Sequence, residues 1–251
     1  MSAASPARVH DHLLGGKDNY LADRRLVAEL LELQPNLRTA ARANRAFLGR
    51  AVAALAALGV DQFLDVGCGL PTRDNVHQMA ARRLPGARTV YLDNDPAVVA
   101  HARALMAADA GVEAMTADLR KPEELLGLAA GSLDWRRPVA LVLTAVLHLL
   151  PDADGPAAIV AALRGALPPG SALVVSHLTA PLAPGVADLY AERCGVPLTV
   201  RPPATLLGYL GGWPLLPPGL APTAAWQHPL PPPDPAACLS HGAVALSPAR
   251  G

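Results

Sequence analysis

Four short segments place glycines, carboxylates or small residues directly after apolar runs of strand length. The glycines follow "QFLDV", one acid follows "RTVYL", a second acid follows "EAMTA", and small residues follow "VALVLT". In an open parallel sheet, ligands bind beyond the carboxyl ends of the strands. Glycines let the backbone approach a ligand closely, and an acid after the second strand can accept hydrogen bonds from ribose hydroxyls. The spacing therefore predicts a site for a ligand that contains adenosine.

The turn after the first of these strands indicates which ligand that contains adenosine is expected to bind. A dinucleotide fingerprint has a third glycine three residues after Gly69, where Thr72 stands, and the acid Asp74 follows it. A pyrophosphate needs that glycine and an open helix N-terminus. The turn instead favours a ligand without phosphate, S-adenosylmethionine, over a nicotinamide dinucleotide. We expect the cofactor to be held by Gly67, Cys68, Gly69, Thr72, Asp93, Asn94, Asp118, Leu119 and Ala145.

Histidines are the candidates for proton transfer at a methyl acceptor. If the accepting atom carries a proton, a base must remove it, and the pKa of histidine suits that task. His77 follows the glycine turn and His148 follows the fourth strand, so we expect these two as catalytic bases. Residues expected to bind the acceptor are Tyr20, Asp74, His177 and Trp226. The alternative for each is an ordinary place on a solvated helix face or in the core.

The elements that must position these residues alternate from position 60 onward. Strands are expected at 62–66, 88–95, 111–118, 138–145, 171–177 and 242–247, with a short one at 213–217. Helices are expected at 75–84, 96–108, 154–167, 184–195 and 202–212, and a proline-rich loop at 228–238. This alternation predicts a doubly wound, mostly parallel sheet of seven strands. Before it, "LVAELLEL" and "ARANRAFLGRAVAALAAL" have apolar residues at helical spacing and predict an N-terminal helical extension.

Five segments also carry a family resemblance. "SPARVHDHLLGGKDNYLADR", "ARANRAFLGRAV", "QFLDVGCGLPTRDNVHQMA", "VYLDNDPAVVAHARALM" and "PVALVLTAVLHLLPD" resemble an actinobacterial family of S-adenosyl methyltransferases within the class I superfamily. The resemblance implies a Rossmann-like fold, S-adenosyl-L-methionine as methyl donor and S-adenosyl-L-homocysteine as product. It places Gly67, Gly69, Asp93 and Asp118 at the cofactor. The sequence departs from the family at Cys68, where threonine is more usual, and in its proline-rich C-terminal third.

The composition of the chain indicates which kinds of partner the protein is expected to bind. The 251 residues include 21 basic and 21 acidic side chains, whereas a dedicated nucleic-acid binder normally has a basic excess. The N-terminus lacks the apolar core of a signal peptide, and the longest apolar run is too short to span a bilayer. The three cysteines form neither a disulfide framework nor a zinc spacing. We expect a cytoplasmic protein, with a homodimer as default, that binds no nucleic acid, membrane or metal.

The predicted organisation is an N-terminal helical cap at 1–59 and a cofactor-binding core at 60–251, in which 178–251 shapes the acceptor pocket. The predicted function is methylation of a small acceptor, an aromatic or indole-containing natural product of secondary metabolism such as a small cyclic peptide. Two alternatives stay open. One is a non-catalytic protein that binds the cofactor or its product and regulates a partner. The other is a nucleotide-dependent oxidoreductase, against which the missing third glycine counts.

Overall fold

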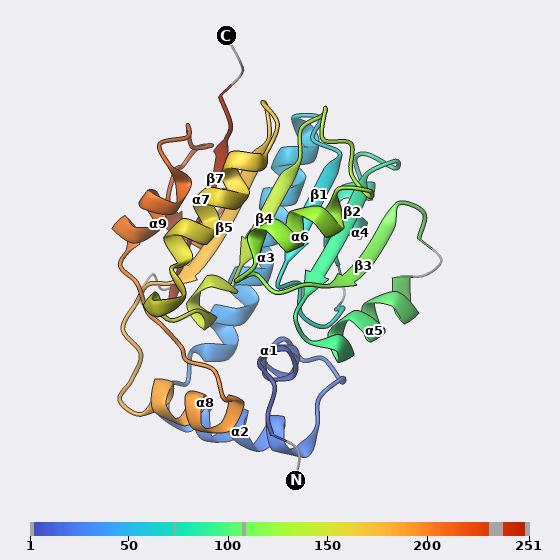
Figure 1. Cartoon of the computed structure of the whole chain (residues 1–251). Helices are drawn as coiled ribbons and strands as arrows, with labels where there is room; N and C mark the ends of the chain where they lie inside the picture. Colours follow the sequence, from blue (N-terminus) through green and yellow to red (C-terminus); the bar gives the residue numbers. More distant parts are fainter. Residues whose placement is uncertain (1–2, 73, 107–108, 231–237, 249–251) are drawn as a thin grey trace.

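The computed structural model describes residues 3–72, 74–106, 109–230 and 238–248. Within these residues, seven strands form one sheet in the order β3-β2-β1-β4-β5-β7-β6 (Figure 1). The strands are β1 (Gln62–Val66), β2 (Arg88–Asp93), β3 (Val112–Thr116), β4 (Ala140–Thr144), β5 (Ala172–Leu178), β6 (Ala221–Pro222) and β7 (Ser240–Leu246). β1 to β5 are parallel, and β7 runs antiparallel to both β5 and β6. The predicted doubly wound, mostly parallel sheet with helices before it is confirmed.

The order of the strands reverses at β1. Phe63 of β1 pairs with Thr89 of β2 on one side and with Ala140 of β4 on the other. The chain therefore leaves β1 toward one edge of the sheet and later returns to its other side. Ligands bind at this kind of switch point, beyond the carboxyl ends of the strands.

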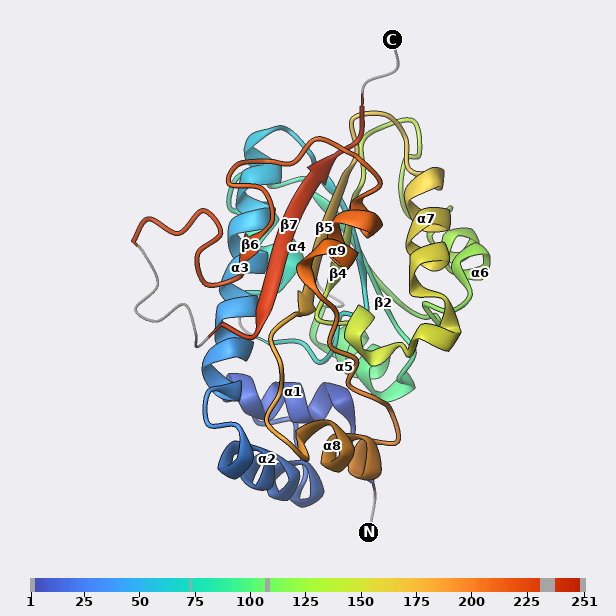
Figure 2. The same cartoon turned by 90° about the vertical axis from the view of Figure 1, so that its left-hand side faces the viewer.

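Two helical layers cover the sheet because its strands alternate their apolar side chains between the faces. One layer consists of α6 (Pro122–Ala129), α7 (Pro156–Ala166) and α9 (Pro203–Leu210), which pack on residues such as Leu64 and Leu141. The other consists of α3 (Leu37–Ala57), α4 (Val76–Ala81) and α5 (Pro96–Met106), which pack on residues such as Phe63 and Val142. Figure 2 shows α3 and α7 on opposite sides of the sheet. Each face thus buries its own core.

A third apolar cluster forms a cap below the carboxyl ends of the parallel strands. It joins α1 (Pro6–Leu14), α2 (Leu21–Leu33) and α8 (Val186–Cys194) through side chains that include Val9, Val27 and Val186 (Figures 1 and 2). α3 packs on the sheet through residues such as Phe47, and its Ala41 also joins the cap cluster. The division into a cap at 1–59 and a core at 60–251 stays a prediction, with α3 in contact with both and α8 added to the cap cluster.

The C-terminal third shows two further differences. The short strand expected at 213–217 is a single bridge between Leu215 and Ala245, and the edge strand is instead β6. Most of the proline-rich loop expected at 228–238 lies outside the described residues. None of the helices described in the structure is long and apolar enough to cross a membrane.

Candidate functional site

A cavity of about 600 Å³ lies between the carboxyl ends of the strands and the cap. Its walls come from the ends of β1 to β4, from α1 and α3, and from the end of α8. The structure brings all of the predicted cofactor residues to this cavity: Gly67, Cys68, Gly69, Thr72, Asp93, Asn94, Asp118, Leu119 and Ala145. Since these residues end four different strands, the topology of the sheet is what brings them together.

The glycines shape the wall after β1. Gly67 has φ 71°, and a Cβ at this position would lie 2.3 Å from Cγ2 of Val146. Gly69 has φ 67°, and a Cβ there would meet no atom within 4 Å. Both conformations are unfavourable for residues with a side chain. Gly67 is therefore required by a neighbouring side chain, whereas Gly69 leaves space for a ligand against its backbone.

Asp93 supplies the buried carboxylate after β2. Its Oδ2 accepts a hydrogen bond from the Gly69 amide at 2.9 Å, and its Oδ1 accepts one from the Asp95 amide at 3.0 Å. Burial raises the pKa of this carboxyl group, while the two amides act in the opposite direction. Each carboxylate oxygen can accept more than one hydrogen bond. The fixed carboxylate beside an open glycine turn therefore fits a ligand with ribose hydroxyls.

Asp118, after β3, has a charged neighbour that the sequence did not indicate. The Arg120 guanidinium donates to its carboxylate with Nη2 to Oδ2 at 2.6 Å, and this contact lowers the pKa of the acid. Arg120 also lines the cavity. A ligand amine at Asp118 would share the carboxylate with Arg120.

His148 lies in η1 (Leu147–Leu149), the short helix that follows β4, and it lines the cavity. Its Nδ1 is buried and has no hydrogen-bond partner among the described residues. Burial, followed by His177, His10 and Arg201, lowers the pKa of His148 well below its usual value. The imidazole is therefore neutral at pH 7 and can accept a proton.

His177 is not on the cavity wall, contrary to expectation. Its side chain is 1% exposed; Nδ1 donates to the Leu178 carbonyl at 2.6 Å, and Nε2 accepts from Arg201 Nη1 at 3.0 Å. Its ring stands edge-on to His148 with 5.6 Å between centroids. Burial lowers the pKa of His177 to about 4. His177 therefore packs against the ring of His148 and does not itself line the cavity in which an acceptor would bind.

His77 also differs from its expected role as a base. Its ring is 6% exposed, with Nδ1 2.9 Å from the Tyr91 hydroxyl and Nε2 3.1 Å from Asp109 Oδ2. It does not line the cavity, because α4 turns this side chain toward β2 and away from the strand ends. His77 is therefore a buried structural residue.

Three residues expected at the acceptor lie elsewhere. Trp226 is fully buried in the core, edge-on to Phe47 at 5.3 Å. Tyr20 is 57% exposed and stacks with the Arg8 guanidinium at 4.9 Å. Asp74 forms an ion pair with Arg82 in a separate, more open groove of about 1060 Å³. The expectation that Trp226 lines the acceptor site was wrong, because tryptophan is large and apolar enough to occupy the centre of a core.

Gly15, Gly16, Lys17 and Asp18, a polar insertion between α1 and α2, line that second groove and not the cavity itself. The groove and the cavity share Asp11, Leu14, Arg45 and Thr72 as walls. The insertion therefore lies next to the candidate site but does not close over it.

Sequence reasoning missed the cavity residues that come from helices. They are His10 and Asp11 of α1 and Asn44 and Arg45 of α3. It also missed Asp65 of β1, whose carboxylate interacts with Arg45. Burial raises the pKa of Asp65 to about 7, with Arg45 opposing and Asp93 reinforcing the shift. One signal was available for Asn44, since it interrupts the apolar stripe that Ala40, Phe47 and Leu48 form on α3.

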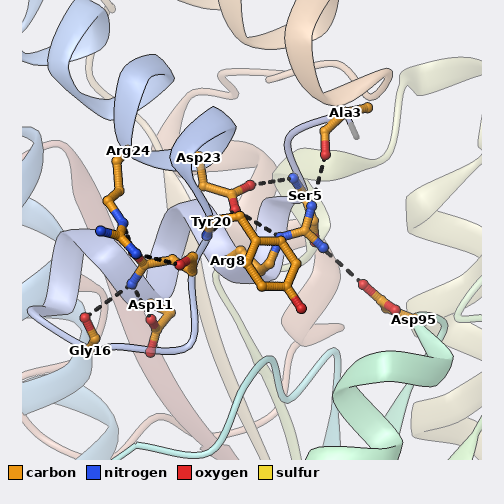
Figure 3. Close-up of polar contacts among 10 residues, drawn as sticks. Ala3, Ser5, Arg8, Asp11, Gly16, Tyr20, Asp23, Arg24 and Asp95 are labelled. Atoms are coloured by element: carbon orange, nitrogen blue, oxygen red, sulfur yellow. Dashed lines mark hydrogen bonds and ion pairs between the residues drawn. The ribbon is translucent and has the colours of Figure 1, made fainter. Parts of the chain in front are cut away.

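The cap that carries His10 is held together by buried carboxylates (Figure 3). Asp23 accepts hydrogen bonds from the Ser5 amide at 3.0 Å, Arg8 Nε at 2.8 Å and the Tyr20 amide at 2.8 Å. The Ser5 hydroxyl donates to Asp95 Oδ2 at 3.3 Å. This last bond ties the cap to the strand-end loop that follows Asp93.

The sheet order, the glycine turn and the strand-end carboxylate together define a class I S-adenosylmethionine-dependent methyltransferase. No group of three or more side chains able to hold a metal ion occurs in the part of the chain that the structure describes. The residues present fit the cofactor, because Gly69 leaves its backbone open to the cavity beside the Asp93 carboxylate.

Comparisons with known proteins give the family. Residues 1–248 match the S-adenosyl methyltransferase family, and the chain belongs to it. A proposed methyltransferase from Thermobifida fusca is 37% identical with a TM-score of 0.92, over 98% of this chain and 96% of its own. A DUF574 family protein from Streptomyces avermitilis is 36% identical with a TM-score of 0.93, over 98% of both chains.

A more distant structure shares the fold alone. Human N-acetylserotonin methyltransferase, solved with S-adenosylmethionine, is 16% identical with a TM-score of 0.50, over 96% of this chain and 67% of its own. No match was found among curated proteins. The chain is thus an S-adenosylmethionine-dependent methyltransferase.

Proposed function

We propose that the protein methylates a small aromatic or indole-containing natural product, with His148 as the base. The observation that carries this proposal is His148, whose neutral imidazole borders the cavity that the cofactor residues line. A cavity of about 600 Å³ falls within the range of small-molecule sites. The walls also include Leu14, Leu149 and Val196, which supply apolar surface for a ring.

When bound, S-adenosylmethionine supplies a methyl carbon whose bond to sulfur breaks with the electron pair left on sulfur, giving S-adenosylhomocysteine. The chain's own residues provide positioning and proton transfer. Asp93 and the glycine turn hold the nucleoside end, and the cap excludes water from the cavity. The His148 imidazole takes the proton that the acceptor loses. A weak base suffices, because an oxygen or nitrogen becomes strongly acidic as it is methylated.

Calorimetric titration tests the cofactor site. We expect saturable binding of S-adenosylmethionine and S-adenosylhomocysteine at micromolar concentration, and loss of binding in Asp93→Ala. The matched control is Asp188→Ala, which removes an exposed acid of α8 outside the cavity and should bind normally. Equal affinity in Asp93→Ala and wild type would contradict the assignment.

Turnover tests the base. The enzyme is incubated with S-adenosylmethionine and a panel of aromatic and indole compounds, and formation of S-adenosylhomocysteine is followed. Loss of one general base typically lowers the rate by about 10²–10⁴-fold. We expect such a loss in His148→Phe with cofactor affinity kept, and none in His101→Gln, outside the cavity. Unchanged turnover in His148→Phe would remove His148 from the reaction.

A further inference from the structure

The groove of about 1060 Å³ beside the cofactor cavity has no part in the proposed reaction. It lies between α3, the end of α4 and the insertion that follows α1. Of the residues expected to hold the cofactor, Thr72 alone lines this groove, on the wall that the two spaces share. The cofactor contacts therefore leave the groove almost unused.

One face of α3 forms a side of the groove with room for a ligand. The lining residues of α3 recur at spacings of three and four, so they lie on one face of the helix. They are Arg42, Arg45, Ala46, Gly49, Arg50 and Ala53. The alanines and Gly49 have small side chains or none, and a Cβ at Gly49 would lie 3.4 Å from Met79 Sδ of α4. Small residues thus open the space, and arginines precede and follow them along the helix.

Positive charge predominates around this groove, although the whole chain has 21 basic and 21 acidic side chains. The basic residues that line it are the three arginines of α3 together with Lys17, Arg82 and Arg83. Its acids are Asp11, Asp18 and Asp74. Two of them have partners in the protein, since Asp74 pairs with Arg82 and the buried Asp11 accepts a hydrogen bond from Asn19 Nδ2 at 2.7 Å. Most of the positive charge is therefore not balanced by the acids of the groove.

Arg50 is a cation that neutral oxygens hold in place. Its Nε donates to the Trp226 carbonyl and its Nη2 donates to the Thr223 carbonyl, both at 2.6 Å. Burial lowers the pKa of this guanidinium, which nevertheless stays charged at neutral pH. The two carbonyls fix the position of the charge and do not neutralise it.

Three exposed cations complete the wall. Lys17, Arg42 and Arg83 have no side-chain hydrogen bond or ion pair in the part of the chain that the structure describes. Their donors remain available, and a guanidinium can bind a phosphate or carboxylate through two parallel hydrogen bonds. A fixed cation and several adjustable ones around one open space suit a ligand with more than one negative charge.

We propose that this groove binds a small organic anion that carries phosphate, sulfate or carboxylate groups. Its volume lies near the upper limit of the range for small-molecule sites. A nucleic acid needs a basic surface that extends along many phosphates, and the chain as a whole has no basic excess. The anion is either the charged end of the methyl acceptor or a separate effector. The site itself does not depend on the base or on the acceptor proposed above.

Calorimetric titration with pyrophosphate, at low ionic strength and without metal ions, tests the site. We expect saturable binding of one pyrophosphate per chain. A double variant with Arg42→Gln and Arg83→Gln should weaken this binding about tenfold. The control combines Arg25→Gln with Arg88→Gln, which removes the same charge from exposed arginines outside the groove and should bind like wild type. Both double variants should keep the affinity for S-adenosylhomocysteine, because none of the four arginines lines the cavity.

A second titration identifies the source of the anion. It compares 2-naphthol with 6-hydroxy-2-naphthoate, which adds a carboxylate to the same ring system, on protein saturated with S-adenosylhomocysteine. If the anion belongs to the acceptor, the naphthoate binds about tenfold more tightly, and pyrophosphate displaces it. If the anion is a separate effector, the two compounds bind equally and pyrophosphate binds in their presence. Either result supports the site, whereas failure of both compounds to bind counts against the proposed acceptor class alone.

Three results would overturn the inference. The first is the absence of saturable pyrophosphate binding. The second is an equal loss in the two double variants, because the anion would then respond to net charge and not to this groove. The third is tighter binding of a short oligonucleotide than of pyrophosphate, lost in the variant of Arg42 and Arg83, which would assign the groove to a nucleic acid. Failure to bind S-adenosylhomocysteine would instead contradict the proposed function and leave the anion site standing.

Discussion

Two groups of buried polar side chains lie on either side of the cavity and differ in how they are satisfied. In the cap, the carboxylate of Asp23 is inaccessible to solvent and accepts three hydrogen bonds, two from backbone amides and one from Arg8. Asp11 is 2% exposed and accepts a hydrogen bond from Asn19 Nδ2 at 2.7 Å. These carboxylates act together with the apolar cluster of the cap in holding α1 and α2 in place.

On the cavity wall the pattern is reversed. Asn44 and His148 each have a buried atom without a partner among the described residues, and burial raises the pKa of the Asp65 carboxyl group although Arg45 opposes the shift. Burying a polar group without a partner is unfavourable, so these residues make the free protein less stable than it could be. In this comparison the satisfied groups stabilise the cap and the unsatisfied ones border the cavity, although Thr89 and Trp135, away from the cavity, also have a buried atom without a partner. Each prediction below tests one side of this difference.

The largest effect is expected for Asp23→Ala in the cap. The change leaves the Arg8 guanidinium and two amides without their acceptor, and breaking a buried charge pair costs about 3–5 kcal/mol. Urea unfolding should show this loss, or an early transition of the cap alone. Glu32→Ala, exposed on the same helix, should change stability by less than about 0.5 kcal/mol. A cap that tolerates Asp23→Ala would contradict its structural role.

Arg201→Met should have the second-largest effect. This guanidinium donates to the carbonyls of Leu147 and Leu150, to Asp152 Oδ1 at 2.7 Å and to His177 Nε2. It therefore holds η1, which carries His148. Hydrogen bonds to charged groups contribute about 1.5–3 kcal/mol, so unfolding should show a loss of about 2–4 kcal/mol.

Arg201→Met should also change the pKa of His148, the proposed base. With η1 released, His148 gains access to water, and its pKa should rise toward the usual value. Histidine NMR titration measures this rise, and Arg136→Met, in an exposed ion pair, is the control. An unchanged His148 titration in a destabilised Arg201→Met would show that Arg201 acts on stability alone.

Asp65→Asn should instead stabilise the protein, by an amount that depends on pH. The folded pKa of Asp65 is about 7 against an ordinary value of 3.8, so between these pH values the folded protein binds the additional proton. The carboxyl costs almost nothing near pH 3, where it is mostly neutral in both states, and its cost grows as pH rises from about 4 to 7. Asp65→Asn should therefore gain up to about 4 kcal/mol at pH 7 and almost nothing at pH 3. A gain that is equal at both values would contradict the raised pKa of this buried carboxyl group.

The same contrast explains which parts could be predicted from sequence. Gly67, Gly69, Asp93 and Asp118 follow strands directly, and a parallel sheet brings strand ends together whatever else the chain does. Asn44 and His10 lie on helices, and their approach to the cavity depends on long-range packing that no local pattern encodes. The expectation that His177 binds the acceptor was wrong, because Arg201, 24 residues away, donates a hydrogen bond to its ring inside the protein.

The smallest effect is expected at the side-chain hydrogen bond between the Ser5 hydroxyl and Asp95 Oδ2 at 3.3 Å, which joins the cap to the strand-end loop. Ser5→Ala removes it and keeps the Ser5 amide on Asp23 (Figure 3). A neutral donor of this kind contributes about 0.5–1 kcal/mol, so stability should change little. Because the cap covers the cofactor cavity, release of S-adenosylhomocysteine in stopped-flow experiments should become about 2–5-fold faster. Ser247→Ala is the control, because the Ser247 hydroxyl donates to the carbonyl of Pro248, and it should release the product at the wild-type rate. If Ser5→Ala also releases the product at the wild-type rate, the cap does not limit release.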